Sequence, residues 1–284
     1  MKPTSAAHTK TVHNTLDSPP ESTGGIGAID TTNVMCFHTT ISVVDVHFHS
    51  CYQIVVSTQS TFDSEIGGKK YKGLHGFIID KYTRHSCSAP QGTFLVYYVE
   101  SKSFLGRQLK SVLIDKNFLN IEAVLSRKQI AEFGERFSQD LHPAQLKIQS
   151  DILLSEIFKG LIRPVTSEVT DARILQATTY IHDHLNETIT LEAVACHIHL
   201  SPDRTRHLFL EQLEVPFSQY ILWKRIKAVL TAAIVDKEKL FDASLKYGFT
   251  DQSHFNRFFK RMFGISAKVI LKNSRFIQFI YPEM

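Results

Sequence analysis

Three histidines and a glutamine in the first third of the chain have the side chains and the spacing of a binding site. His47 and His49 stand two residues apart, Gln53 follows, and His85 comes 36 residues after His49. Residues at positions i and i+2 of a strand point to the same face of a sheet. His47 and His49 can therefore share a cavity with His85 from a neighbouring strand.

This spacing echoes the three-histidine metal pattern of cupin barrels, in which a glutamate usually completes the site. Gln53 replaces that glutamate and removes a negative charge that helps to bind a divalent ion. We therefore predict no metal ion and no other cofactor, and expect a site for an unidentified small effector. The residues assigned to this effector site are His47, His49, Gln53 and His85. Two alternatives stay open, namely metal binding by the histidines and redox sensing by Cys51 and Cys87; the simplest reading is ordinary barrel core.

Two stretches in the last third of the chain carry side chains that can read duplex DNA. Ser201-Pro202 supplies an N-cap and a first-turn proline for one helix, and Thr250 or Asp251 caps another. Gln and Asn can pair bidentately with adenine, Arg with guanine, and Lys or Arg with phosphates. The outward-facing residues are Asp203, Arg204, Arg206 and His207 on the first helix, and Gln252, Ser253, His254, Asn256, Arg257 and Lys260 on the second.

Each of these helices must be positioned by the helix before it. Leu191, Val194, Ala195 and Ile198 recur at helical spacing before the first, and Gly248 ends a helix from Leu240 before the second. This pattern predicts two helix-turn-helix units. The apolar stretch Pro216–Val235 between them would form a rod of about 30 Å. Successive major grooves on one face of DNA lie ~34 Å apart, so such a rod can place both units in neighbouring grooves.

The same residues resemble the AraC/XylS family of bacterial transcription regulators over roughly residues 172–271. The resemblance is carried by Ser201-Pro-x3-Arg206-x2-Phe209, by Tyr220 and by Gly248-Phe-Thr-Asp-Gln-Ser-His-Phe-Asn-Arg-Phe-Phe-Lys260-x3-Gly264. It implies a seven-helix DNA-binding domain. By motif position, it also places Asp203, Arg206 and His207, and the run Gln252, Ser253, His254, Asn256 and Arg257, toward the groove.

The sequence departs from the family pattern at several turns. His199 and Glu214 stand where the family usually has glycine, and a non-glycine residue with positive φ costs about 1 kcal/mol. Ala243-Ser244 replaces the usual Ile-Ala, and Ser266-Ala267 the usual Thr-Pro. We therefore expect strained or altered turns in the first unit and safer base contacts from the second.

Length and composition frame these sites. The 284 residues suffice for two domains, and 21% charged residues with no long apolar run exclude general disorder and a membrane span. Four cysteines without a C-x-x-C pair, and no visible secretory signal, predict a reduced cytoplasmic protein. The net charge is +4, and residues 251–275 carry six basic side chains against one acidic. Such a segment can be a phosphate-facing surface, although the charge alone favours a solvated helix face.

The predicted fold class is α+β, with a cupin-like β-barrel and appended helices followed by an all-α domain. Strands are expected at Ile41–His49, Tyr52–Val56, Gly76–Ile79 and Thr93–Val99, with a hairpin turn at Gly67-Gly68; helical periodicity begins after Phe104, and everything from Asp171 onward is expected to be helical. The predicted divisions are a flexible arm (1–32), a sensor and dimerisation domain (33–165), a linker (166–170) and a DNA-binding domain (171–284).

These features together predict a transcription regulator that is not an enzyme. Its expected partners are double-stranded DNA, RNA polymerase, a small-molecule effector and a second copy of the chain, with no membrane; activation is the expected mode. The sequence does not identify the effector, the operator or the regulated genes, and it does not exclude repression in place of the expected activation. Two alternatives remain: a cupin-type metalloenzyme with a helical C-terminal domain, and an architectural DNA-binding module without sensing.

Overall fold

The computed structural model describes residues 33–41, 43–89, 91–137, 141–161 and 170–279. The expected arm, and all of the expected linker except Thr170, lie outside these ranges. The strands are β1 (Val34–Thr39), β2 (Val43–His47), β3 (Tyr52–Ser57), β4 (Phe62–Ile66), β5 (Lys69–Leu74), β6 (Gly76–Ile79), β7 (His85–Ser88), β8 (Phe94–Val99), β9 (Phe118–Asn120) and β10 (Ser274–Phe279). The helices are α1 (Phe104–Val112), the 3-10 helix η1 (Ile121–Ala123), α2 (Arg127–Arg136), α3 (Pro143–Lys159), α4 (Ala172–Asp183), α5 (Leu191–His197), α6 (Pro202–Leu213), α7 (Phe217–Ile234), α8 (Leu240–Lys246), α9 (Gln252–Phe263) and α10 (Ala267–Asn273).

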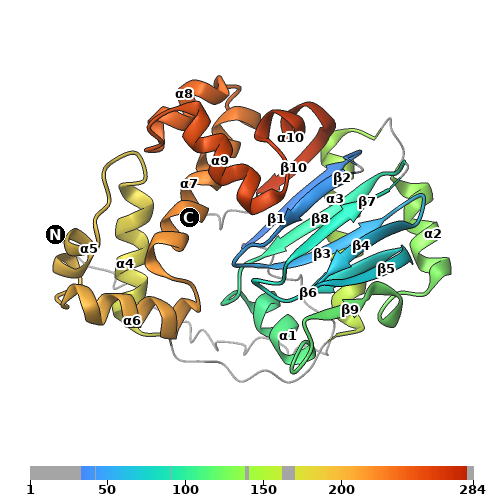
Figure 1. The fold of residues 1–284 in the computed structure, drawn as a ribbon, viewed down its shortest axis with the longest axis horizontal. Helices are drawn as coiled ribbons and strands as arrows, with labels where there is room; N and C mark the ends of the chain where they lie inside the picture. The colour runs from blue at the N-terminus through green and yellow to red at the C-terminus, as the bar shows by residue number, and fades with distance from the viewer. Residues whose placement is uncertain (1–32, 42, 90, 138–140, 162–169, 280–284) are drawn as a thin grey trace, which may run out of the picture.

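The predicted α+β class is confirmed, with a β-rich part followed by a helical part (Figure 1). Among the described residues the strands form two sheets and not one closed barrel. The first sheet has the order β10-β1-β8-β3-β6-β9 and the second the order β2-β7-β4-β5, and their strand pairs are antiparallel. The predicted hairpin turn joins β4 to β5, with φ of 58° at Gly67 and 79° at Gly68, as a tight two-residue turn of this kind requires.

The six-stranded sheet is buried on both faces. In β1, Val34 and Cys36 pack with helices α1 to α3, whereas Met35 and Phe37 pack with α7 and α9. This alternation follows from the period of two along a strand. The sheet is therefore the middle layer of the molecule, and one of its faces meets the helical part directly.

Helix α3 shows how an apolar stripe divides between core and surface. Its buried residues include Leu146, Leu153 and Ile157, which join the core under the sheet. Ile148 and Ile152 point away from that core and stay 55% and 36% exposed. The helix thus has a core face and a second, partly apolar outer face.

The expectation that everything after Asp171 is helical is wrong for β10. This strand pairs antiparallel with β1, from Met35 opposite Phe279 to Thr39 opposite Ser274. The sequence Phe276-Ile277-Gln278-Phe279 is rich in residues that favour strands, and β1 offers it a free edge. The helical part of the chain therefore ends by completing the sheet of the β-rich part.

Within the described ranges, none of the helices combines the length and the apolarity that a membrane crossing requires.

Candidate DNA-binding surface and adjoining pocket

The first helix-turn-helix unit consists of α5 and α6. The Ser201 hydroxyl accepts a hydrogen bond from the backbone N–H of Arg204 at 3.2 Å, and Pro202 occupies the first turn, as the sequence predicts. His199 in the turn has φ of 55°, and Glu214 at the end of α6 has φ of 57°. The backbone thus keeps the left-handed conformation of the expected glycines, at a cost of about 1 kcal/mol for each residue.

The outward face of α6 pairs its charges within the helix. Asp203 lies 3.9 Å from Arg206 and 3.7 Å from His207, and Arg204 donates to Glu211 at 2.9 Å. All these groups are exposed enough for water to screen them, so the pairs are weak. A DNA contact by this helix would still have to compete with its own carboxylates.

The second unit, α8 and α9, presents a different face. Asp251 caps α9 by accepting from the backbone N–H of His254 at 2.7 Å, and Gly248 has φ of 78° in the turn. The buried stripe of α9 consists of Phe255, Phe259, Met262 and Phe263. Gln252, Ser253, Asn256, Arg257 and Lys260 lie on the opposite, wholly or partly exposed side. Arg257 makes no ion pair with any other described residue, and its charge is available to DNA.

Helix α7 connects the two units and contributes to both of their cores. Its 18 residues give a length of about 27 Å. Ile221 packs with the first unit, and Ile226, Val229 and Leu230 pack with the second. The two units are therefore joined by one continuous helix that packs into both of their cores.

The C-terminal end of α9 packs against β2. The Asp45 backbone N–H donates to the Gly264 carbonyl at 3.3 Å, and the Asp45 carboxylate lies 3.0 Å from the Lys260 ammonium group. Gly264 has φ of 72°, and a Cβ there would lie 2.6 Å from Val44 and 2.7 Å from the His47 ring. Only glycine permits so close an approach. One flank of the second reading helix is thus in contact with the β-rich part.

Two carboxylates join the β-rich part to the helices by ion pairs. Glu100 accepts at 3.0 Å from Trp223 and from the ammonium groups of Lys224 and Lys227. Burial alone would raise the pKa of Glu100, but the two lysines outweigh burial and lower that pKa far below its ordinary value. The Glu100 carboxylate is therefore ionised at neutral pH.

The second carboxylate, Glu214, lies at the end of α6. It pairs with Lys81, with Lys110 at 2.6 Å and with Lys102 at 3.4 Å, all from the β-rich part. Burial opposes ionisation, yet the lysines lower the pKa of Glu214 to about 2. The position where glycine was expected thus carries an ion cluster between the two parts of the chain.

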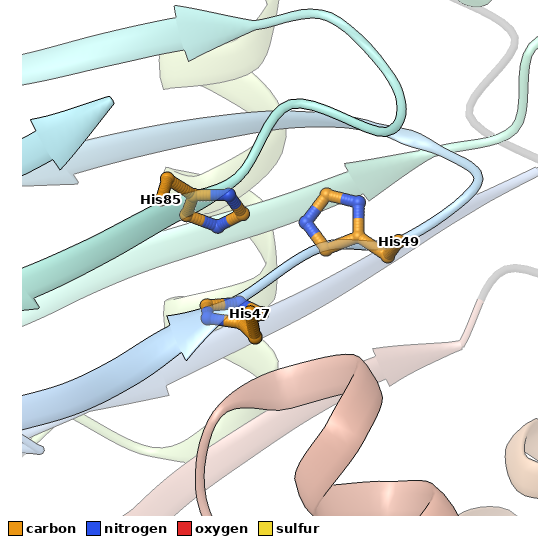
Figure 2. A group of neighbouring side chains, drawn as sticks. All are labelled: His47, His49 and His85. Atoms are coloured by element: carbon orange, nitrogen blue, oxygen red, sulfur yellow. The ribbon is translucent and has the colours of Figure 1, made fainter. Parts of the chain in front are cut away.

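The structure brings together the three histidines assigned to the effector site. His47 ends β2, His85 begins β7, and the two are paired across the sheet. His49 lies in the loop after β2, not on the strand itself, yet its ring turns toward the other two (Figure 2). Ring centroids are 4.1 Å apart for His47 and His85, and 5.1 Å apart for His49 and His85.

Each ring is oriented through its Nδ1 atom. The partners are backbone carbonyls: Asp45 for His47 and Cys51 for His49, both at 2.9 Å, and Thr83 for His85 at 2.8 Å. A carbonyl can only accept, so Nδ1 carries the proton in each ring and Nε2 has a free lone pair. All three Nε2 atoms and the Gln53 Oε1 atom are buried without a hydrogen-bond partner. An unsatisfied buried acceptor costs about 1–3 kcal/mol.

The rings are neutral at physiological pH. Burial lowers the pKa of His47 to about 4. Burial together with the His47 ring lowers the pKa of His49 to about 3, and the pKa of His85 is also well below its ordinary value. The cluster therefore presents free lone pairs and not positive charges.

A cavity of about 50 Å³ adjoins the histidines. His47, Gln53 and His85 line it from the β-rich part, whereas Phe263, Ile265 and Ile270 line it from the helical part. These three apolar residues were not predicted from the sequence. The neighbours of an apolar helix residue do not indicate that it lines a cavity formed with residues far away in the chain. The cavity is large enough for a few water molecules or an ion.

The two cysteines near the histidines are poor redox sensors. Burial raises the pKa of Cys87 to about 12 and that of Cys51 well above its ordinary value. The thiolate is the reactive form, and it is scarce at neutral pH in both positions. These data favour the reading of both cysteines as core residues.

Comparison with known proteins bears first on the helical part. Residues 194–273 match a family profile described as a helix-turn-helix domain. The chain is 33% identical over 97 residues to the arabinose operon regulatory proteins of Salmonella typhimurium and Escherichia coli. These matches cover 34% of this chain and 34% and 33% of the two relatives, so the chain spans about a third of the length of the curated relatives it matches.

Solved structures of ToxT are similar over most of the chain. The apo form of a ToxT variant from Vibrio cholerae superimposes with a TM-score of 0.55 at 14% identity, covering 85% of this chain and 98% of that chain. At that identity the likeness shows a shared fold. Together with the sequence matches, it confirms the predicted resemblance to the AraC/XylS family.

Proposed function

We propose that this chain, whose C-terminal part is an AraC/XylS-type helix-turn-helix domain, is a sequence-specific DNA-binding transcription regulator. The observation that carries the proposal is α9. It is a capped helix with four large apolar residues anchored in the core. Gln252 and Arg257 lie on its outer side, and the partly exposed Asn256 lies beside them. Those three residue types can read base edges in a major groove.

The two units act together in this proposal. Helix α7, about 27 Å long, packs into both units, and in this proposal it holds them so that they enter successive major grooves, which lie ~34 Å apart on one face of DNA. Arg257 and Gln252 would read bases, whereas Lys260 would contact phosphate. Helix α6 would contribute less to the discrimination between DNA sequences, because the charged side chains of its outer face already pair with one another. These side chains include Asp203, Arg204, Arg206 and His207.

The cavity beside the histidines is the proposed effector site, lined in part by His47, Gln53 and His85, with His49 beside them. A related ToxT structure, with a TM-score of 0.52 to this chain, contains (E)-4-(8-methylnaphthalen-1-yl)but-3-enoic acid. A molecule of that size needs several hundred Å³, far more than the present 50 Å³. Such an effector would have to displace the wall made by Phe263, Ile265 and Ile270, and thereby move the end of α9.

This arrangement supplies a physical route from effector to DNA. The wall residue Phe263 is the last residue of α9, and Lys260, one turn earlier, pairs with Asp45. An effector that separates α9 from β2 would free this flank of the reading helix. In this proposal the protein acts in the cytoplasm and recruits RNA polymerase as an activator.

Dimerisation belongs to the same proposal. The outer face of α3, where Ile148 and Ile152 are 55% and 36% exposed, would pack against a second copy of the chain. Two copies would double the contacted length of DNA and raise specificity.

Selection from a random duplex library would test DNA reading, because the operator is unknown. We expect enrichment of a motif with two elements separated by about one helical turn of 10–10.5 base pairs. Footprinting should then show protection of two successive grooves for each protomer. Lys128→Ala, on an exposed lysine of α2, is the control and should leave binding unchanged. A selection that enriches no sequence would contradict the proposal.

A further inference from the structure

The three imidazole nitrogens that lack a hydrogen-bond partner lie close enough together to share one ligand. One ring nitrogen from each of His47, His49 and His85 lies within 4.8 Å of those of the other two. Because the Nδ1 atoms are bonded to carbonyls, the free atoms are three Nε2 acceptors. A single water molecule has two protons and can satisfy two of them. A cation can satisfy all three.

Hydrogen bonds already hold the three histidine rings in fixed orientations, as in a metal site. Histidines that bind a metal usually donate the other ring nitrogen to a carbonyl or carboxylate, which sets the tautomer and the ring orientation. All three rings have such a carbonyl partner. The loop of His49 is tied down by the Tyr82 backbone N–H, which donates to the His49 carbonyl at 2.7 Å, and its ring packs edge-on against Tyr98.

We propose that His47, His49 and His85 bind one divalent transition-metal ion of the Zn²⁺ class through their Nε2 atoms. Three imidazoles suit Zn²⁺, which bonds to histidine nitrogen at ~2.0–2.1 Å and leaves a fourth position for water or another ligand. Tetrahedral geometry at that bond length puts the nitrogens roughly 3.4 Å apart. One nitrogen of each ring already lies within 4.8 Å of the others, so binding requires the ligand atoms to approach one another by about 1.4 Å at most.

The fourth position opens toward the cavity. Its 50 Å³ accommodates a metal-bound water. Gln53 Oε1 is a further buried acceptor without a partner among the residues that line the cavity, and it would accept a hydrogen bond from that water. In the sequence, the glutamine at position 53 argued against a metal because it lacks the negative charge of a glutamate. It nevertheless leaves the three nitrogen ligands intact.

Metal titration of the full chain tests the inference. The purified protein is stripped with a chelator and titrated with Zn²⁺ in a calorimeter, with metal content measured separately by mass spectrometry. We expect one equivalent bound for each chain and a rise in the melting temperature that the chelator reverses. Co²⁺, used as a spectroscopic probe, should give the visible absorption of a nitrogen-ligated site.

Variants locate the site. His85→Gln and His49→Gln should each weaken Zn²⁺ binding by more than about 100-fold, because each removes one of three ligands. His182→Gln, which removes an exposed histidine of α4, is the matched control and should bind one Zn²⁺ as tightly as the parent. Circular dichroism of the metal-free proteins shows whether each variant is folded. If a variant does not fold, the loss of visible Co²⁺ absorption on adding Zn²⁺ to the parent serves as the second readout.

Two results would overturn the inference. One is a folded parent that binds less than a tenth of an equivalent of Zn²⁺ and gives no Co²⁺ absorption. The other is a folded His49→Gln or His85→Gln variant that binds as tightly as His182→Gln, because the ion would then lie elsewhere. Neither measurement involves DNA, so their failure would leave the DNA-binding proposal unaffected.

Discussion

The two helix-turn-helix units have the same local architecture but are attached to the rest of the molecule in opposite ways. The first is tied at the end of α6 by the ion pairs of Glu214, and its outer face is occupied by its own carboxylates. The second shares an apolar core with the sheet through Phe263, and its outer face carries Arg257, which makes no ion pair with any residue that the structure describes. One repeated motif is therefore attached to the β-rich part by the ion pairs of Glu214 in the first copy and by apolar packing of Phe263 in the second.

Removing the apolar contact between Phe263 and the sheet should have the largest effect on stability. Phe263→Ala empties a site where Phe263 meets Phe37, Tyr98 and Trp223, so we expect a loss of about 3–5 kcal/mol in the free energy of unfolding. Urea denaturation measures it. Leu210→Ala, on the exposed side of α6, is the control and should cost less than about 1 kcal/mol. Equal losses in the two variants would show that the second unit is not anchored by its core.

Neutralising the Glu100 cluster should come next. Glu100→Gln keeps the shape of the side chain but leaves Lys224 and Lys227 without their counter-charge in a largely buried place. We expect a loss of about 2–4 kcal/mol in the free energy of unfolding. The control is Glu132→Gln, which breaks an exposed pair with Lys128 and should cost no more than about 0.5 kcal/mol. A cost for Glu100→Gln as small as that would mean the cluster is solvated.

DNA affinity distinguishes the two reading helices. Arg257→Ala should weaken specific binding by about 1–3 kcal/mol, whereas Arg206→Ala should have a smaller effect because Asp203 already offsets part of its charge. Fluorescence anisotropy with a selected operator, at constant salt, provides both numbers. The assignment of α9 as the principal reader fails if the Arg206 variant loses more affinity than the Arg257 variant.

We expect the smallest effect from protonation of Glu214, which would remove its ion pairs with the lysines of the β-rich part at low pH. The folded-state pKa of Glu214 is about 2, below its ordinary value of 4.5. Its contribution is therefore complete above about pH 4.5 and is lost as the pH falls from 4.5 toward 2. Unfolding followed over this range should show a steeper acid loss for the parent than for Glu214→Gln. Parallel curves would remove Glu214 from the list of groups that stabilise the docked arrangement.

The sequence predicted best what is local. The caps at Ser201 and Asp251, the turn at Gly248 and the apolar stripe of α9 all depend on neighbouring residues, and each is confirmed. The convergence of His47, His49 and His85 was also predicted from their spacing, although His49 lies in a loop and not on a strand.

What could not be predicted is set by long-range packing. Nothing near Phe263 in the sequence indicates that it closes a cavity whose other wall is formed by His47 and Gln53. The glutamate at position 214 looked only like a poor replacement for glycine, because its lysine partners are more than a hundred positions away. The segment after Ser274 was expected to be helical, because the strand with which it pairs, β1, lies at the far end of the sequence.

The pairing of β10 with β1 has a consequence for folding of the chain during its synthesis on the ribosome. β1 is made early, yet the strand that covers its outer edge is made only after the last helix, α10. Until then the nascent chain exposes an open strand edge, which is a template for aggregation. The edge of β1 is therefore covered only after residue 279 has been synthesised. A chain truncated before β10 would keep this exposed edge, which chaperones and proteases recognise.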